Sequence, residues 1–202
     1  MKYTRLHNLA LSLTFIGGGV FFAATPAIAS PQNNCVMQTV MCSGGSSSSA
    51  PSFQASSGGL IGGPSLSAQR IDTILANAGS PAQGSGWAFE QYSREYGIDD
   101  AYGLAFFKHE SSFGLTGAAR QTLSIGNIIC TPGYSCIGRF RAYSSWAESI
   151  KDWYALIKDQ YIGKWGCTSV ADIIPHYAPS SDNNDEAAYI ASVEADVSSW
   201  RK

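Results

Sequence analysis

The stretch that most constrains this chain is an uncharged run, AYGLAFF, from Ala101 to Phe107. A helix over these residues would be apolar nearly all round, and such a helix is stable only when it is buried. Asp99 or Asp100 can cap its start, and the sequence SSFG at 111–114 offers a cap and a turn at its end. The sequence therefore predicts a central buried helix around which the rest of a domain packs.

Glu110 lies in the last turn of this predicted helix. It follows Phe106 by four positions and Phe107 by three, so the two rings share its helical face. Burial beside the rings and the negative end of the helix dipole both disfavour the ionised carboxylate and raise its pKa. A carboxyl group with a raised pKa is suited to general-acid catalysis. The alternative is an ordinary solvated glutamate at a helix end.

Four segments together resemble the bacterial glucosaminidase family of peptidoglycan hydrolases. They are LAFFKHESSFG at 104–114, GNI at 126–128, FRAYSSWAESIKDW at 140–153 and HYAPSSDNNDEAAYIASV at 176–193. The resemblance covers about Leu66 to Trp200. It implies a lysozyme-like fold and an endo-β-N-acetylglucosaminidase that cleaves the β-1,4 bond after N-acetylglucosamine. The family's acid is the Glu of the Glu-Ser pair after the buried helix, which maps onto Glu110.

The same resemblance suggests three further site residues. Tyr177 looks like the tyrosine that the family places beside the bond being broken, although a tyrosine packed into the core is an equal alternative. Ser124 and Asn127 resemble the segment that holds the N-acetyl sugar, with Asn127 the better candidate for a substrate contact. An Asn next to Gly is also a common turn pair. The chain departs from many glucosaminidases in its Cys130–Cys136 loop and in lacking an acidic residue in that lobe.

A second catalytic carboxylate is hard to find near Glu110 in the sequence. No Asp or Glu occurs between Glu110 and Glu148, although the stretch contains three arginines. Two-carboxylate glycosidases need an acid on each side of the bond. Glu148 and Asp152 are nearest, and both fit an exposed helix face. We therefore expect a one-acid site, in which the substrate's acetamido group or a water molecule assists.

The first 29 residues have the pattern of a secretory signal peptide. Lys2 and Arg5 precede an apolar run from Leu9 to Ala24, and Ala27-Ile28-Ala29 is a small-x-small cleavage signal. A retained anchor is the weaker alternative, because the run contains three consecutive glycines and no stop-transfer charges follow it. We expect a secreted or wall-associated protein without a stable membrane anchor after cleavage.

Charge argues against two classes of partner. Removing Lys2 and Arg5 leaves 11 basic and 15 acidic residues, a formal charge of −4. Nucleic acid and anionic membrane surfaces select basic proteins. The predicted partner is instead the glycan strand of peptidoglycan.

Residues 30–65 are expected to precede the folded domain, which we place at 66–202. Gly, Ser and Pro make up 17 of the 23 residues from Ser43 to Ser65, as in a flexible linker. Beyond it, helical periodicity and capping residues predict six helices and little strand, an all-α domain in which minor β-structure is possible. The starts are expected at Ser67, Trp87, Asp99 or Asp100, Ser145, Thr168, and Asn183 or Asn184.

Five cysteines in an exported chain suggest disulfides with one thiol left over. Cys130 and Cys136 enclose TPGYS, whose Pro-Gly pair favours a turn, so they are the expected pair. Cys35 and Cys42 can form a second local loop, which leaves Cys167 unpaired. The spacing predicts no metal site, and no cofactor is expected.

Two rival functions remain at this point. A lytic transglycosylase or muramidase would act on the same glycan, but lytic enzymes usually carry a GLMQ-like segment where this chain reads SIGNIIC at 124–130. The other rival is a catalytically silent glycan-binding domain that keeps the lysozyme-like fold.

Overall fold

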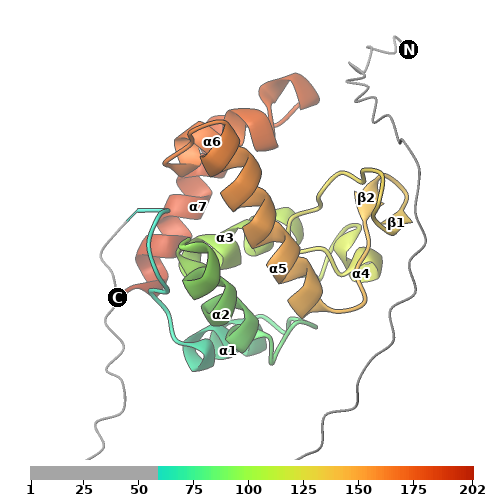
Figure 1. Cartoon of the computed structure of the whole chain (residues 1–202). Coiled ribbons are helices and arrows are strands. Elements are labelled where there is room, and N and C mark those ends of the chain that lie inside the picture. The colour runs from blue at the N-terminus through green and yellow to red at the C-terminus, as the bar shows by residue number, and fades with distance from the viewer. Residues whose placement is uncertain (1–58) are drawn as a thin grey trace, which may run out of the picture. The chain divides into compact units, whose positions relative to one another are not determined.

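The central helix predicted from the uncharged run is present and buried. In the computed structural model, which describes residues 59–202, α3 spans Asp100–Ser111 and buries every residue from Ala101 to Phe107. Asp99 caps its start by accepting the amide N–H of Ala101, and Ser112 ends it in the left-handed conformation. Figure 1 shows α3 in the middle of the fold with α5 crossing in front of it.

Five longer helices surround α3, and their aromatic side chains interlock with it. They are α1 (Ala68–Asn77), α2 (Gly86–Tyr96), α5 (Trp146–Leu156), α6 (Val170–Tyr177) and α7 (Glu186–Trp200). Phe107 of α3 packs against Phe89 of α2, and Phe106 packs against Trp153 of α5. The predicted mostly helical domain is confirmed.

Side-chain caps fix where most of these helices begin. Ser67 and Ser145 accept backbone N–H groups at the starts of α1 and α5, as predicted. The start of α6 differs from the prediction by one residue, because Ser169 rather than Thr168 makes the cap, paired with Asp172 in a capping box. Asp185 rather than Asn183 or Asn184 caps α7.

Two short irregular helices occur in the second half of the domain. The π-helix η1 (Ile157–Lys164) continues α5, and the 3-10 turn η2 (Ser180–Asp182) precedes α7. The helix α6 contains Pro175 and ends at Tyr177.

The stretch between α3 and α5 forms a small lobe with little regular structure. It contains α4 (Ala119–Thr122) and a two-stranded antiparallel hairpin of β1 (Cys136–Ile137) and β2 (Phe140–Arg141). Cys136 pairs with Arg141, and Ile137 with Phe140. In Figure 1 this lobe lies to one side of the helices. Short strands in this stretch agree with the expectation of minor β-structure.

Ordered structure begins before Leu66. Leu60 is buried, Ile61 forms an isolated bridge with Ile98, and the amide of Asp99 donates to the carbonyl of Leu60. The end of the predicted linker is therefore attached to the start of α3. The predicted signal peptide, most of the predicted linker, Cys35 and Cys42 lie outside the described residues. Within 59–202, no helix is both long and apolar enough to cross a membrane.

Candidate active site

Glu110 is held at the end of α3 by hydrogen bonds to both carboxylate oxygens. The hydroxyl of Tyr189 donates to Oε1 over 2.6 Å, and Nδ2 of Asn127 donates to Oε2 over 3.1 Å. The same Nδ2 also lies 3.1 Å from the backbone carbonyl oxygen of Glu110, which it donates to as well. Glu110 as a residue retains some exposure to solvent, whereas its carboxyl group is largely buried. Two donors thus fix the orientation of this carboxyl group.

The environment raises the pKa of Glu110, in the direction expected from the sequence. Burial is the largest influence and disfavours the charged form, whereas the hydrogen bonds from Tyr189 and Asn127 favour it and lower the pKa. Burial prevails. Each carboxyl oxygen has two lone pairs and receives one hydrogen bond, so capacity for a proton remains. Glu110 can therefore hold a proton and deliver it, as a general acid must.

Tyr189 reaches Glu110 from the first turn of α7. Its buried ring packs on Phe106 with centroids 5.5 Å apart and stacks on His109 at 3.6 Å. These contacts leave the ring little freedom and aim the hydroxyl at Oε1. Burial and the neighbouring Glu110 carboxylate raise the pKa of Tyr189 well above its ordinary value. Tyr189 therefore acts at this site as a proton-bearing donor.

Tyr177 lies beside the site but does not contact Glu110 through its hydroxyl. The hydroxyl donates to the carbonyl oxygen of Gly126 over 2.5 Å, and the ring meets Phe106 edge-on at 5.3 Å. Burial, then the charge of Glu110, raise its pKa well above the ordinary value. Tyr177 therefore supports the backbone just before Asn127. Its ring packs against the core residue Phe106, as in one alternative considered from the sequence, and it lies near the charge of Glu110, as in the other.

Gly126 fits where no larger residue would. A Cβ atom at this position would lie 2.3 Å from the Tyr177 hydroxyl oxygen and 2.6 Å from Cδ1 of Trp153. The absence of a side chain allows the chain to pass close to both rings. Asn127 follows immediately in the left-handed conformation, with φ of 44°, and this turn directs its amide to Glu110.

The two residues predicted to contact substrate lie in different environments. Asn127 is partly exposed and bonded to Glu110. Ser124 is fully buried, and within residues 59–202 its hydroxyl has no hydrogen-bond partner. The structure thus brings Asn127 to the acid but leaves the Ser124 hydroxyl inside the protein, where a substrate does not reach it in this conformation.

The lobe that follows is fastened to α5 through Asp152. Its carboxylate pairs with Nη1 of Arg141 at 2.8 Å and accepts the hydroxyl protons of Tyr143 and Tyr134 at 2.6 Å and 3.2 Å. Arg141 is buried rather than solvated, and Asp152 does not lie on a freely exposed helix face as the sequence suggested. Asp152 is therefore occupied by structural contacts, whereas Glu148 is exposed and bonds to Ser144.

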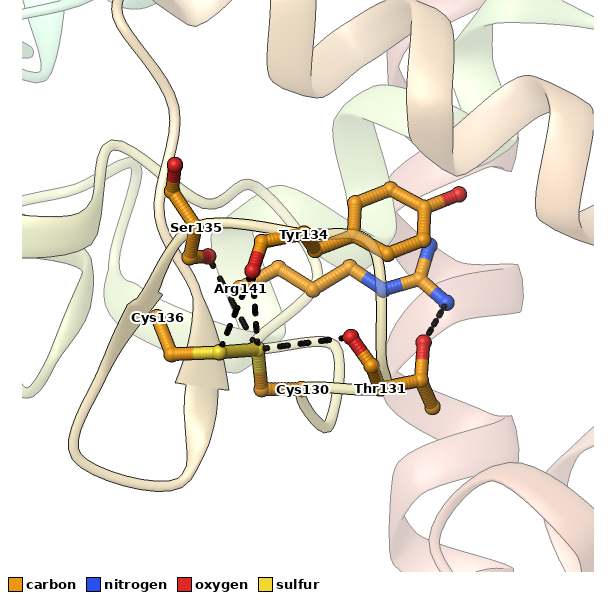
Figure 2. Close-up of a disulfide and its surroundings, with 6 residues drawn as sticks. All are labelled: Cys130, Thr131, Tyr134, Ser135, Cys136 and Arg141. Atoms are coloured by element: carbon orange, nitrogen blue, oxygen red, sulfur yellow. Dashed lines mark hydrogen bonds between the residues drawn. A yellow bond between two sulfur atoms is a disulfide. The ribbon is translucent and has the colours of Figure 1, made fainter.

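The predicted disulfide between Cys130 and Cys136 is confirmed. Figure 2 shows the loop that it closes, with the Tyr134 ring lying on the guanidinium group of Arg141. The guanidinium carbon lies 3.6 Å from the ring centroid, and Nη2 donates to the Thr131 hydroxyl over 3.1 Å. Among residues 59–202, Cys167 is buried and forms no disulfide. The loop is thus held by a covalent bond and by the Arg141–Asp152 pair.

Sequence reasoning missed Tyr189 as a site residue. Its ring is buried on α7, and its hydroxyl donates to Glu110. The available signal was that a buried tyrosine hydroxyl needs a hydrogen-bond partner.

Comparison with known proteins gives no relative from which to assign these residues. No protein-family model matches the sequence, and no curated protein matches it either. Within residues 59–202, no group of three or more His, Cys, Asp or Glu side chains is placed to hold a metal ion.

Proposed function

We propose that this protein is a secreted peptidoglycan hydrolase with a lysozyme-like domain, and that Glu110 is its general acid. The observation that supports this is the combination at one side chain of partial exposure, a raised pKa and two orienting donors. A solvated carboxylate at a helix end, the alternative considered from the sequence, would have neither the raised pKa nor the two fixed donors. The resemblance of segments 104–114 and 176–193 to glucosaminidases supplies the substrate class.

In the proposed reaction, Glu110 gives its proton to the glycosidic oxygen after N-acetylglucosamine. The bond between C1 and that oxygen breaks, and the oxygen leaves as a hydroxyl group. Positive charge develops at C1, where the acetamido carbonyl oxygen of the same sugar can attack. Water then attacks C1, the bond from C1 to the acetamido oxygen breaks, and the water gives a proton to the Glu110 carboxylate, which restores the acid. Tyr189 and Asn127 stabilise the carboxylate that Glu110 becomes.

A lytic transglycosylase is the second candidate, because an enzyme of this kind also works with a single acid. The influences on the pKa of Glu110 are burial and two hydrogen bonds, and no second carboxylate among residues 59–202 is one of them. A one-acid site suits either hydrolysis with help from the acetamido group or internal attack by the C6 hydroxyl, which makes an anhydro sugar.

Export is proposed as well. The N-terminal pattern supports it, and so does the disulfide, because such bonds persist in oxidising compartments.

The first experiment identifies the product. The full chain is incubated with purified peptidoglycan. The released fragments are reduced with borohydride and identified by mass spectrometry. Reduced N-acetylglucosamine ends support the proposal. Reduced N-acetylmuramic acid ends indicate a muramidase, and anhydro ends indicate a transglycosylase. Release of no fragment from several wall types would mean a silent binding domain.

A pair of variants then tests the residue. Glu110→Gln should lower turnover by at least about 10²-fold, because general-acid catalysis contributes 10²–10⁴-fold. Glu194→Gln is the matched control, since Glu194 is exposed and accepts a long hydrogen bond of 3.3 Å from Tyr102. Full activity in Glu110→Gln would remove Glu110 from the mechanism.

A further inference from the structure

An exposed tryptophan lies on the helical side of the candidate site. Trp165 follows η1 directly and is 45% exposed. The buried ring of Tyr161 meets it edge-on at 5.0 Å, and the exposed His176 lies against it at 4.8 Å. We call Tyr161, Trp165 and His176 the aromatic surface. Trp165 thus presents part of its indole ring to solvent, while Tyr161 and His176 contact the rest.

The backbone that presents Trp165 is unusual. The π-helix η1 occupies all eight residues from Ile157 to Lys164. π-Helical segments are rare and occur frequently at functional sites. Two further bonds continue the wide turn, from the amides of Trp165 and Cys167 to the carbonyls of Gln160 and Tyr161. Tyr161 thereby points into the core while Trp165, four residues later, remains at the surface beside α6.

Ring contacts place Trp165 near the site around Glu110. Tyr161 lies 5.8 Å from Tyr177, whose ring meets Phe106, and Phe106 meets Tyr189. These contacts pass through buried rings and fix where Trp165 lies relative to Glu110, to which Tyr189 donates. At the surface, the exposed His176, which contacts Trp165, directly precedes the partly exposed Tyr177 beside the site.

From this arrangement we propose that Trp165 forms a sugar-binding subsite. Its indole ring stacks on a pyranose ring of the glycan strand that lies away from the bond that Glu110 cleaves. The inference rests on the proposed function and names where the substrate extends. A pyranose in a β-1,4-linked strand presents a face of C–H groups, which suits an indole ring, and it carries hydroxyl and acetamido groups at its edge. Tyr161 packs edge-on against the indole and holds it in place, and His176 offers ring nitrogens to those polar groups.

The test measures binding and turnover separately. The full chain carrying Glu110→Gln is titrated by calorimetry with peptide-free glycan strands of alternating N-acetylglucosamine and N-acetylmuramic acid. Trp165→Ala in this background should weaken binding about tenfold, as expected for loss of one aromatic stack with its buried area. Trp165→Phe should restore part of the affinity, because it keeps a ring.

Trp87→Ala is the matched control. Trp87 is 50% exposed on α2, where it lines a cavity together with residues of α1 and α2. It should leave the affinity unchanged. Equal affinities of the Trp165→Ala and parent chains, or no binding of the strands by the parent, would overturn the subsite.

The two proposals fail differently. If Trp165→Ala weakens glycan binding but the wild-type protein releases no fragments, the subsite stands and the hydrolase is rejected. Fragment release by wild type with unchanged kcat/KM in Trp165→Ala would keep the hydrolase and reject the subsite.

Discussion

The hydroxyl of Tyr189 donates to Oε1 of Glu110 over 2.6 Å, and so joins two residues that are 79 positions apart in the sequence. The bond works against the burial that raises the pKa of Glu110, because a donor stabilises the ionised carboxylate. The packing of α7 on α3 therefore sets the proton affinity of the candidate acid.

Removing this donor should shift the pH profile of the proposed cleavage. Tyr189→Phe keeps the ring contacts with Phe106 and His109 but loses the hydroxyl. The pKa of Glu110 should then rise further, so the acid form persists to higher pH. We expect the alkaline limb of the kcat/KM profile to move to higher pH by about one pH unit. This shift corresponds to a loss of about 1.4 kcal/mol of stabilisation of the ionised Glu110 carboxylate.

Tyr102→Phe is the control for that variant. Its hydroxyl bonds to Glu194 over 3.3 Å at another point between α3 and α7. It should leave the pH profile in place. A limb that stays fixed, or moves to lower pH, in Tyr189→Phe would contradict the role given to the tyrosine.

Gly126→Ala should damage both stability and activity. The new methyl group would meet the Tyr177 hydroxyl and Trp153, and the fully buried Trp153 cannot move aside. Overpacking of this kind costs about 1–3 kcal/mol. Displacement of the adjacent Asn127 should also weaken its bond to Glu110. Denaturant unfolding and turnover measure the two effects.

Gly63→Ala provides the comparison, because a methyl group there has open space around it and the backbone is not in the left-handed region. It should be neutral in both assays. Wild-type stability in Gly126→Ala would mean that the Tyr177 ring can retreat, and that its bond to the Gly126 carbonyl is dispensable.

Local patterns in the sequence were enough to predict the helices and the disulfide, because caps, periodicity and a short Cys loop act over a few residues. Asp99 at the start of α3 and the Cys130–Cys136 pair are examples. The approach of Tyr189 to Glu110 depends on how whole helices pack, and no local pattern encodes it. The buried position of Ser124 likewise follows from the path of the chain between α3 and α5.

Asp152 illustrates the same limit. Its spacing on α5 fits an exposed face, yet the lobe folds back and supplies Arg141, Tyr134 and Tyr143 to its carboxylate. A helical pattern identifies the side of a helix that packs on the core, but it does not reveal what a loop later places over the other side.

The disulfide should stabilise the fold modestly. Cys130 and Cys136 are separated by six positions, and closing a loop of that length contributes about 2 kcal/mol in the chain-entropy model. Replacing both by Ser should lower the free energy of unfolding by that amount. Activity should change less, because the Arg141–Asp152 pair still holds the lobe to α5. Addition of reductant should reproduce the loss in wild type, and an unaffected wild type would contradict the prediction.

A buried carboxyl group near the start of α3 should make stability depend on pH. Asp100 is fully buried, and its Oδ1 accepts the amide protons of Ser65 and Leu66 at 2.9 Å and 3.0 Å. Within residues 59–202, its buried Oδ2 has no hydrogen-bond partner. Burial, followed by the charge of Asp99, raises the pKa of Asp100 from 3.8 to about 7. Between pH 3.8 and about 7, the folded state therefore keeps a proton on Asp100 that the unfolded state has released.

Asp100→Asn tests this coupling, because the amide stays neutral and keeps an oxygen for the two backbone donors. A raised pKa gives a stabilising contribution that is complete below pH 3.8 and is lost as pH rises through about 7. Relative to the variant, wild type should thus lose stability on the order of a few kcal/mol between pH 4 and pH 8. Unfolding in urea at several pH values measures the difference, with the exposed Asp182→Asn as a control that should follow wild type. Parallel pH dependences of wild type and Asp100→Asn would show that Asp100 is ionised in the folded protein, and that the contacts from Ser65 and Leu66 outweigh its burial.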